Sequence, residues 1–388
     1  MMKSNEELKA MMIEWRQHFH KNPETAFEEV KTSEYIANLL EDMGIEVVRN
    51  VGQTGVVGTL KVGDSNRVIG IRADMDAINV SETTDVSYKS INDGKMHACG
   101  HDGHMATLLG AAKMLSETKN FNGTVRFIFQ PAEEPGKGSK AMIDAGLLER
   151  FPLDEIYAMH NRPNYREGTI NVRKGSIMSS EDNFVIKIKG KGSHASSPQL
   201  GVDPLVIAAQ IILGFQTIVS RNIDPFLPAV ISCTEIFSDG AHNALPSNVT
   251  IMGDTRSNNQ EVKQIIEKRM REMCENICAA NNAECEFEYT YEFEPTINWD
   301  EQVEAAIEAA TSVVGSENVD GNCLPWSASE DFGYFLTKIP GAQLFIGSST
   351  SENLAEIIPL HNSNYDYNDN TLLTGAKFFK KLVELRLK

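Results

Sequence analysis

The sequence predicts an α/β protein in which a mostly parallel sheet is interrupted by an inserted second domain. In the N-terminal half, segments of helical periodicity alternate with short runs of β-branched and other apolar residues. Such alternation is typical of a parallel sheet with helices on both faces. A different order of elements starts near residue 180 and ends near residue 292, after which the alternation returns. The predicted division is therefore 1–179, 180–292 and 293–388.

The expected elements follow from periodicity and from turn residues. Helices are expected over residues 5–20, 30–43, 101–117 and 139–149, and strands over 45–49, 55–61, 68–72, 124–129 and 155–160. The insert is predicted as one βαββαβ unit, with strands over 184–189, 229–237, 248–256 and 284–292 and helices over 204–220 and 259–281. A helix over 301–314, a strand over 342–346 and a helix over 372–387 complete the first domain.

The composition excludes several classes of protein. Acidic residues outnumber basic ones 54 to 36, and the net charge of −18 disfavours binding to nucleic acids or to anionic membranes. The longest apolar stretch, residues 205–215, is too short to cross a bilayer, and the N-terminus lacks an apolar signal core. Six cysteines without a CxxC motif indicate reduced thiols. We expect a cytoplasmic protein.

Residues 96–104 have the composition of a metal site. The segment Met-His-Ala-Cys-Gly-His-Asp-Gly-His places Cys99 and His101 on the turn that opens a predicted helix. Thiolate and imidazole are ligands that zinc prefers, and the glycines let the backbone bend close to an ion. Taken alone, the segment also fits an ordinary helix N-terminus with a buried cysteine and solvent-facing histidines.

Further candidate ligands follow other predicted strands. Glu133 and Glu134 come after the strand over 124–129 and point in different directions, so one can bind a metal ion while the other acts as a general base. His160 ends the next buried strand, and His361 lies in a late loop. Each residue alone is as well explained by a structural or solvated role. Their shared position at one edge of the sheet favours a common site.

Asp74 and Asp76 follow the strand over 68–72. If the chain stays extended, carboxylates two residues apart point the same way, which suits groups that orient imidazole ligands from behind. The alternative is a charged strand exit.

The order of motifs resembles that of one enzyme family. Arg-Ala-Asp-Met-Asp-Ala, the 96–104 segment, Gln-Pro-Ala-Glu-Glu, Gly-x-x-His-Ala-x-x-Pro, Asn-x-Leu-Pro and Ser-Glu-Asp-Phe occur in sequence between Arg16 and His361. The chain is thus similar to the metallo-amidohydrolases that include hippurate hydrolases, N-acyl-amino-acid amidohydrolases and auxin-conjugate hydrolases. The resemblance implies a di-metal hydrolase domain, with residues 180–292 as a satellite domain that mediates dimerisation and closes over the site.

The resemblance also implies roles for individual residues. Glu133 becomes the general base, and His194 becomes the group that stabilises the transition state, often from the partner subunit. Asn243 and Arg256 become the groups that hold the carbonyl and the carboxylate of the substrate. Two divalent ions per subunit would be bound by Cys99, His101, Glu134, His160 and His361.

Three positions depart from the family pattern. Ser193 stands where a small residue such as glycine is usual, Gln199 where histidine is common, and Asp254 within a segment that is more often Gly-Thr-x-Arg. All three bear on the satellite side of the pocket, so they concern substrate preference rather than the reaction.

The implied reaction is hydrolysis of the amide bond of N-acyl amino acids. Glu133 would take a proton from water whose pKa the metal ions lower, and would pass it to the departing amine. Zinc or manganese is the expected metal, and cobalt and nickel also suit the ligands. A homodimer or larger homo-oligomer that binds a small N-acyl amino acid is expected.

Other functions remain open at this stage. One is a metallopeptidase or deacylase for dipeptides or for N-acetyl or N-succinyl diamino acids. Another is a non-catalytic metal-dependent binding protein, for which Glu133 would be dispensable. A Cys99 nucleophile with His101 as its base would leave the other candidate ligands unexplained. No GxSxG elbow, phosphate-binding loop or GxGxxG fingerprint after a strand is present.

Overall fold

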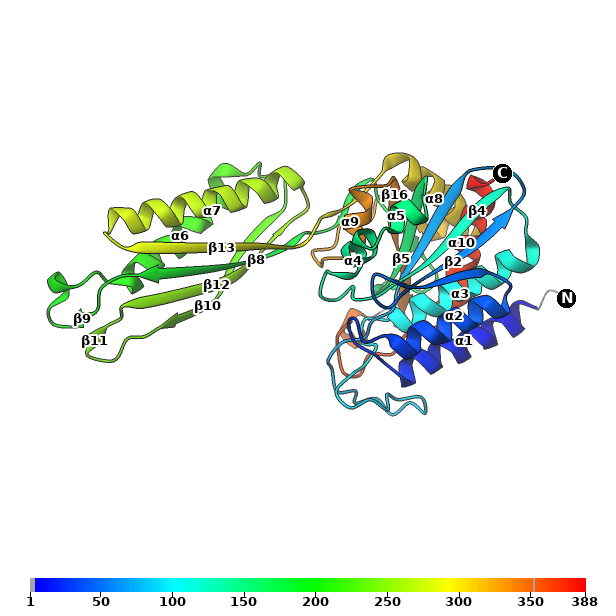
Figure 1. The fold of residues 1–388 in the computed structure, drawn as a ribbon, viewed down its shortest axis with the longest axis horizontal. Coiled ribbons are helices and arrows are strands. Elements are labelled where there is room, and N and C mark those ends of the chain that lie inside the picture. Colours follow the sequence, from blue (N-terminus) through cyan, green and yellow to red (C-terminus); the bar gives the residue numbers. More distant parts are fainter. Residues whose placement is uncertain (1–3, 352) are drawn as a thin grey trace. The chain divides into compact units, whose positions relative to one another are not determined.

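The computed structural model describes residues 4–351 and 353–388. The chain divides into two compact units (Figure 1). The first unit comprises Met1–Ile177, Ile297–Pro325 and Asp331–Lys388, and the second comprises Met178–Thr296 and Trp326–Glu330. The predicted insert, residues 180–292, falls within the second unit. Its role in dimerisation and closure stays a prediction.

The first unit is built on an eight-stranded sheet. The strand order is β1 (Glu46–Val51), β2 (Gly55–Val62), β4 (Gly123–Gln130), β3 (Val68–Asp74), β5 (Glu155–Arg166), β16 (Gly341–Ser349), β6 (Ile170–Asn171) and β15 (Val319–Asp320). The central strands β4, β3, β5 and β16 are parallel. β1 and β2 are antiparallel additions at one side, and β6 runs antiparallel to β16. The α/β class is confirmed, although the sheet is mixed outside its centre.

Helices cover both faces of this sheet. One face is covered by α1 (Asn5–Lys21), α2 (Val30–Asp42), α3 (His101–Thr118), α8 (Asp300–Val314) and α10 (Leu372–Arg386), and the other by α4 (Gly138–Asp144), α5 (Leu147–Arg150) and α9 (Phe332–Leu336). Neighbouring strand residues alternate between the two cores: Phe127 packs with the first group of helices and Ile128 with the second. This alternation is the period of two that a strand imposes.

One predicted helix is wrong in its extent. Residues 139–149 were expected as a single helix, but the chain breaks after Asp144 and restarts at Leu147. The break lies at Gly146, which adopts a φ of 82°. This left-handed conformation is open to glycine and interrupts the helical hydrogen-bond ladder.

The second unit is a four-stranded antiparallel sheet with two helices on one face. The strand order is β10 (Ala229–Ser238), β12 (Asn248–Ser257), β8 (Glu181–Lys189) and β13 (Glu284–Phe293). α6 (Pro204–Asn222) and α7 (Gln260–Ala280) pack on the side chains of Phe184, Ile186 and Ile188. The elements follow the predicted βαββαβ order. Short strands are β9 (Ser193–His194) and β11 (Ala244–Leu245) within this unit, and β7 (Gly175–Met178) and β14 (Thr296–Asn298) near its limits.

By length and composition, one helix in the described part of the chain, α6, is apolar enough to cross a bilayer. It is longer than the predicted apolar stretch of residues 205–215. However, Ile207, Ile211 and Phe215 pack into the core of the second unit, and a core helix meets the same two criteria. The cytoplasmic location stays a prediction.

Candidate metal centre

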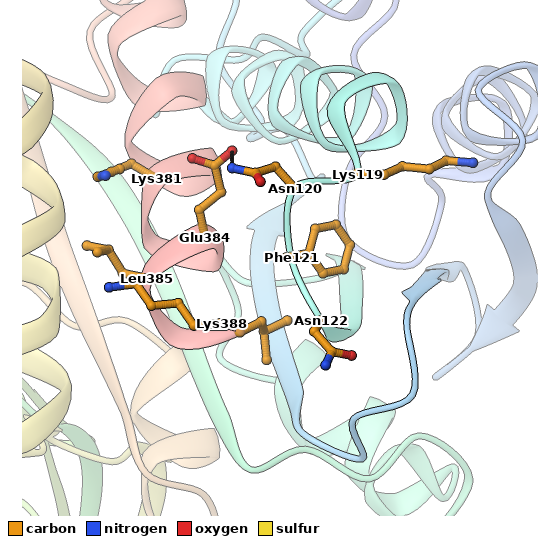
Figure 2. A pocket seen from close by; sticks show the side chains of 9 residues that line it. Lys119, Asn120, Phe121, Asn122, Lys381, Glu384, Leu385 and Lys388 are labelled. Atoms are coloured by element: carbon orange, nitrogen blue, oxygen red, sulfur yellow. Dashed lines mark hydrogen bonds between the residues drawn. The ribbon is translucent and has the colours of Figure 1, made fainter.

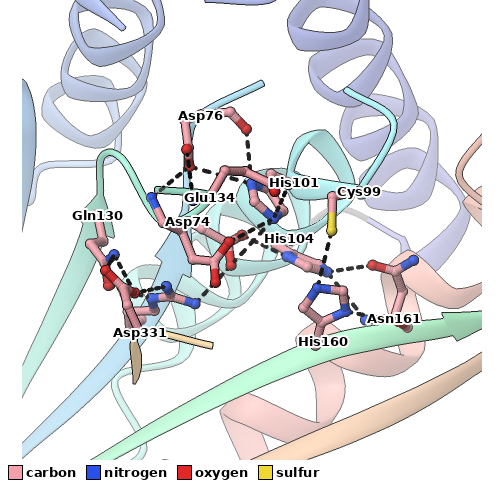
Figure 3. Close-up of polar contacts among 12 residues, drawn as sticks. Asp74, Asp76, Cys99, His101, His104, Gln130, Glu134, His160, Asn161 and Asp331 are labelled. Carbon is pink, nitrogen blue, oxygen red and sulfur yellow. Dashed lines mark hydrogen bonds and ion pairs between the residues drawn. The ribbon is translucent and has the colours of Figure 1, made fainter. Parts of the chain in front are cut away.

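The predicted ligands of the first unit lie at or near the carboxyl ends of its central strands. β3 ends at Asp74 and β4 ends at Gln130. His160 lies within β5, which continues to Arg166, so the predicted strand end at residue 160 is wrong. Because β4, β3 and β5 are parallel neighbours, the segments that follow them meet at one edge of the sheet. α3 begins at the same edge with His101, whose ring is hydrogen-bonded to the segment after β3 (Figure 3).

Five predicted ligands form two overlapping groups that share Cys99. In the first group, the ligand atoms of Cys99, His101 and His160 lie within 4.8 Å of one another. Sγ of Cys99 is 3.5 Å from Nε2 of His160. In the second group, Cys99, Glu134 and His361 meet the same limit, and Nε2 of His361 is 3.4 Å from Oε1 of Glu134. Segments that are far apart in the sequence therefore converge on one place.

Two buried atoms of these groups indicate that a cation belongs there. Nε2 of His101 and Oε1 of Glu134 make no hydrogen bond, and they lie 3.9 Å apart. Such orphaned polar atoms are rare in protein interiors. A divalent cation would bind both atoms, and thiolate, imidazole and carboxylate are ligands of zinc. Manganese, cobalt and nickel also bind imidazole and carboxylate. The residues present thus fit a metal centre.

Asp76 orients His101 and the two glutamates through hydrogen bonds. Nδ1 of His101 donates to the carbonyl oxygen of Asp76 at 2.8 Å, which leaves Nε2 available to an ion. The Asp76 carboxylate accepts the backbone N–H groups of Glu133 and Glu134 at 3.0 and 3.1 Å. Asp76 lies beyond the end of β3, whereas Asp74 is the last residue of that strand.

Asp74 has different neighbours. Its carboxylate accepts hydrogen bonds from Arg72 at 2.7 Å and from His104 at 2.6 Å, and it lies 3.8 Å from Nε2 of His101. Burial would raise the pKa of Asp74, but the charges of His101, His104 and Arg72 hold it well below its usual value. Asp74 therefore supplies a fixed negative charge beneath the site.

Burial and nearby charges set the ionisation of the ligands. Burial lowers the pKa of His160 well below its usual value, so its ring is neutral and has a lone pair to offer. Burial opposes the ionisation of Glu134, but His361 and His101 lower its pKa overall. Burial raises the pKa of the Cys99 thiol, which must lose its proton to bind a metal ion.

Unusual backbone conformations hold two parts of the site. His361 adopts a φ of 64°, and its N–H donates to the carbonyl of Ala98 at 2.8 Å. Such conformations cost energy for non-glycine residues and cluster at functional sites. Gly100 has a φ of 93°, and a Cβ there would lie 2.6 Å from the side chain of Asn161. The turn between Cys99 and His101 therefore requires glycine.

Glu133 lies beside the ligands. Its side chain is 6% exposed, and its Oε2 is 3.9 Å from Nε2 of His101. Glu133, His101 and Glu134 together form another group whose ligand atoms lie within 4.8 Å. The geometry thus allows either glutamate to face an ion.

Two residues without a predicted role also support the site. Asn161 lies between His104 and Tyr365, with contacts of 2.6 Å to each. Asp331 accepts hydrogen bonds from Gln130 and from the backbone of Ser139, and pairs with Arg72. Asp331 belongs to the Ser-Glu-Asp-Phe motif. The sequence therefore marked this residue as part of a motif, but the motif had no predicted function.

The remaining predicted site residues belong to the second unit. His194 in β9 is paired with Ala244 in β11, and the N–H of Ala195 donates to the carbonyl of Asn243 at 3.0 Å. Nδ1 of His194 is 2.8 Å from the hydroxyl of Ser196. His194 and Asn243 are therefore exposed neighbours, His194 in β9 and Asn243 in the turn just before β11.

Arg256 is already paired within the second unit. Its Nη1 is 2.7 Å from Glu181 and 3.1 Å from the hydroxyl of Ser329, and its Nε is 3.0 Å from Asp254. Two carboxylates thus surround the one guanidinium that was predicted to bind a substrate carboxylate.

A surface pocket of the first unit lies apart from this chemistry. It is formed by Lys119, Phe121, Asn122, by Lys381 near the end of α10, and by Lys388 beyond that helix (Figure 2). None of the predicted site residues lines it. The metal centre is identified by its donor atoms rather than by a deep cavity.

Comparisons with known proteins identify the family of the chain. Residues 70–385 match the family described as Peptidase family M20/M25/M40. A hippurate hydrolase of Campylobacter jejuni subsp. jejuni is 40% identical over 373 residues, which cover 96% of each chain. An N-acetylcysteine deacetylase of Bacillus subtilis is 36% identical over 379 residues, which cover 97% of each chain.

A solved structure agrees as well. The Bacillus subtilis YXEP protein, described as a dinuclear metal binding peptidase from the M20 family, is 32% identical with a TM-score of 0.86. The match covers 98% of this chain and 99% of that chain. Because the family match spans most of the sequence and these relatives align almost end to end, the chain belongs to peptidase family M20/M25/M40 and is a hydrolase of that family.

Proposed function

We propose that the protein hydrolyses the amide bond of N-acyl amino acids with two divalent metal ions. The observation that carries this proposal is the convergence of five ligand side chains, two of them with orphaned buried atoms, beside Glu133. The proposed ligands are Cys99, His101, Glu134, His160 and His361. When bound, the ions would act as Lewis acids and lower the pKa of water.

The side chains of the first unit would handle the proton. Glu133 lies next to His101, whereas Glu134 lies next to His361 and is the proposed ligand of the pair. Glu133 would therefore accept a proton from the attacking water and deliver it to the departing amine. Asp76 fixes the backbone of both glutamates. The small exposure of Glu133 keeps bulk water from competing for the proton.

The names of the relatives support the substrate class. One is a hippurate hydrolase and another an N-acetylcysteine deacetylase, and both names denote removal of an acyl group from an amino acid. We therefore propose a small N-acyl amino acid as the substrate. The substrate panel described next ranks the acyl groups by the rate at which free amino acid is released.

The test is the release of free amino acid from a panel of substrates. Hippurate, N-acetyl amino acids, simple dipeptides and N-acetyl or N-succinyl diamino acids are incubated with protein stripped by a chelator and then reloaded with zinc or manganese. The proposal predicts metal-dependent release from hippurate or N-acetyl amino acids. Cleavage of dipeptides or diamino-acid derivatives alone would support the peptidase function instead, and no cleavage would support a non-catalytic role.

Arg256 is proposed to bind the carboxylate of the substrate, in competition with Asp254. Arg256→Ala is expected to raise KM for hippurate by about 10–150-fold, because a charge-assisted hydrogen bond is worth roughly 1.5–3 kcal/mol. Asp254→Asn should lower KM, since it removes one competing carboxylate 3.0 Å from Nε. The uncharged analogue hippuramide serves as the control, and its KM should not respond. If hippurate and hippuramide respond equally, Arg256 does not bind the carboxylate.

A homodimer is proposed through the second unit, with His194 acting on the partner's site. β10 is an edge strand with exposed apolar side chains at Ile236 and Phe237, a surface that favours pairing with a second copy. An inactive His194→Ala variant mixed with an inactive Glu133→Gln variant should then regain up to about a quarter of the wild-type activity by forming mixed dimers. Failure to regain activity, after subunit exchange has been verified by a mass-tagged chain, would place His194 in its own subunit.

A further inference from the structure

The turn that carries Glu133 and Glu134 is held by buried carboxylates. Three consecutive backbone N–H groups in this turn donate to carboxylate oxygens. The N–H of Ala132 is 2.9 Å from Oε1 of Glu29. The N–H groups of Glu133 and Glu134 are 3.0 and 3.1 Å from the carboxylate of Asp76. The orientation of both glutamates therefore depends on two acceptors, of which only Asp76 belongs to a recognised motif.

Ala132 is the strained residue of this turn. Its φ of 49° lies in the left-handed region, which residues with a Cβ rarely adopt. Backbone of this kind directs successive N–H groups towards one side and forms a concave site for anions. The strain persists only where surrounding contacts hold it. The hydrogen bond to Glu29 is such a contact, at the residue directly before Glu133.

Glu29 is itself held in place. Its side chain is 0% exposed, and its Oε2 accepts a hydrogen bond of 2.6 Å from the hydroxyl of Thr54. The carbonyl of Thr54 is held in turn by the hydroxyl of Ser33 at 2.6 Å. Glu29 precedes the first residue of α2, but its side chain does not cap that helix. Both carboxylate oxygens are thus used to join α2, the turn before β2 and the turn after β4.

Packing alone does not explain a carboxylate at this position. Within residues 4–351 and 353–388, Glu29 forms no ion pair, and its carboxylate accepts hydrogen bonds from the neutral donors Thr54 and Ala132. Burial accordingly raises its pKa to about 7. Burying such a group without a cation is unfavourable, and an apolar residue of similar size would avoid the cost.

We propose that Glu29 is a positioning residue, whose hydrogen bond to Ala132 fixes the turn that aims Glu133 and Glu134 at the metal centre. The proposal rests on the functions proposed above for these two glutamates. It adds a residue that is 103 positions away from Ala132 in the sequence. Glu29 touches neither substrate nor metal ion and acts through the backbone of the turn.

The test compares Glu29→Met with Glu29→Gln. Methionine matches the length of the side chain but accepts no comparable hydrogen bond, whereas the amide oxygen of glutamine can still accept the N–H of Ala132. The methionine variant should lose about 10–100-fold in kcat and in metal affinity, which is the usual loss when a residue that orients a metal ligand is replaced. Its KM should change by less than about threefold. The glutamine variant should recover most of both losses. Metal affinity is read by calorimetric titration with zinc or manganese.

Glu155→Met is the matched control. Glu155 is also buried, at 1% exposure, but it lies at the first residue of β5 and pairs with Arg67 and Arg386. Its replacement should lower the thermal unfolding midpoint without changing metal affinity or kcat of the folded protein. This control separates the general cost of losing a buried carboxylate from the specific effect on the turn.

Two results would overturn the proposal. One is a folded Glu29→Met variant with the metal affinity and kcat of the wild type, and the other is a glutamine variant as impaired as the methionine variant. If Glu29→Met does not fold, Thr54→Val decides, because it removes the hydroxyl that orients Glu29. It should show the same losses at smaller size, and unchanged values would reject the proposal. Calorimetry needs no substrate, so a wild-type protein that cleaves nothing contradicts the proposed function and leaves this test intact.

Discussion

Replacing Glu133 by glutamine is expected to lower kcat by about 10²–10⁴-fold, the range that proton transfer by a positioned side chain contributes. The amide cannot accept the proton of the attacking water, but its shape is nearly that of the carboxylate. The backbone N–H of Glu133 still donates to Asp76 at 3.0 Å, so the turn should keep its conformation. Metal content should therefore match that of the wild type.

The control for this prediction is Glu134→Gln. Oε1 of Glu134 is buried without a hydrogen bond and lies 3.4 Å from Nε2 of His361, so loss of its charge should reduce the metal content as well as kcat. Metal analysis by mass spectrometry and single-turnover kinetics distinguish the two variants. Near-normal kcat for Glu133→Gln, or metal loss from that variant alone, would remove Glu133 from its proposed role.

Removal of the metal is expected to abolish hydrolysis and to destabilise the first unit. An ion that binds only the folded state stabilises it by about 4 kcal/mol when its free concentration is about 1,000 times Kd. The protein dialysed against a chelator should therefore unfold at a lower temperature by calorimetry. Zinc or manganese should restore both activity and stability. Magnesium should restore neither, because it prefers oxygen ligands and the centre offers thiolate and imidazole.

The outcome that contradicts this prediction is equally definite. If the stripped protein keeps its turnover number and its unfolding temperature, then Cys99, His101 and His160 form a buried polar cluster without a metal ion. The Cys99 nucleophile considered from the sequence would then become the next mechanism to test.

The sequence was sufficient to predict the edge of the sheet at which the ligands meet. Glu134 follows one buried strand, His160 was predicted to end another, and Cys99 and His101 open a predicted helix, while parallel strands bring their carboxyl ends together. The position of these residues at one edge of the sheet could therefore be predicted without knowledge of any side-chain contact. His361 is different, because it lies in a loop without periodicity, so the pattern named it as a candidate ligand without giving its place in the fold.

The parts that sequence reasoning missed depend on local backbone conformation or on distant contacts. Gly146 breaks a helix that the apolar pattern alone continues, because a positive φ is not visible in periodicity. Asp331 reaches Gln130 across 201 positions, and Glu29 reaches Ala132 across 103. The pairing of Arg256 with Glu181 likewise depends on how neighbouring strands align. Such contacts are fixed by tertiary packing and leave no local signal.

The most direct test of the central claim is anomalous diffraction from crystals of the protein loaded with zinc or manganese. The account predicts two adjacent peaks in the first unit, in contact with Cys99, His101, Glu134, His160 and His361. Glu133 should lie next to the peaks but, unlike Glu134, should not bind the ions. Peaks at other residues, or no peak at this cluster in protein that hydrolyses hippurate, would contradict the account.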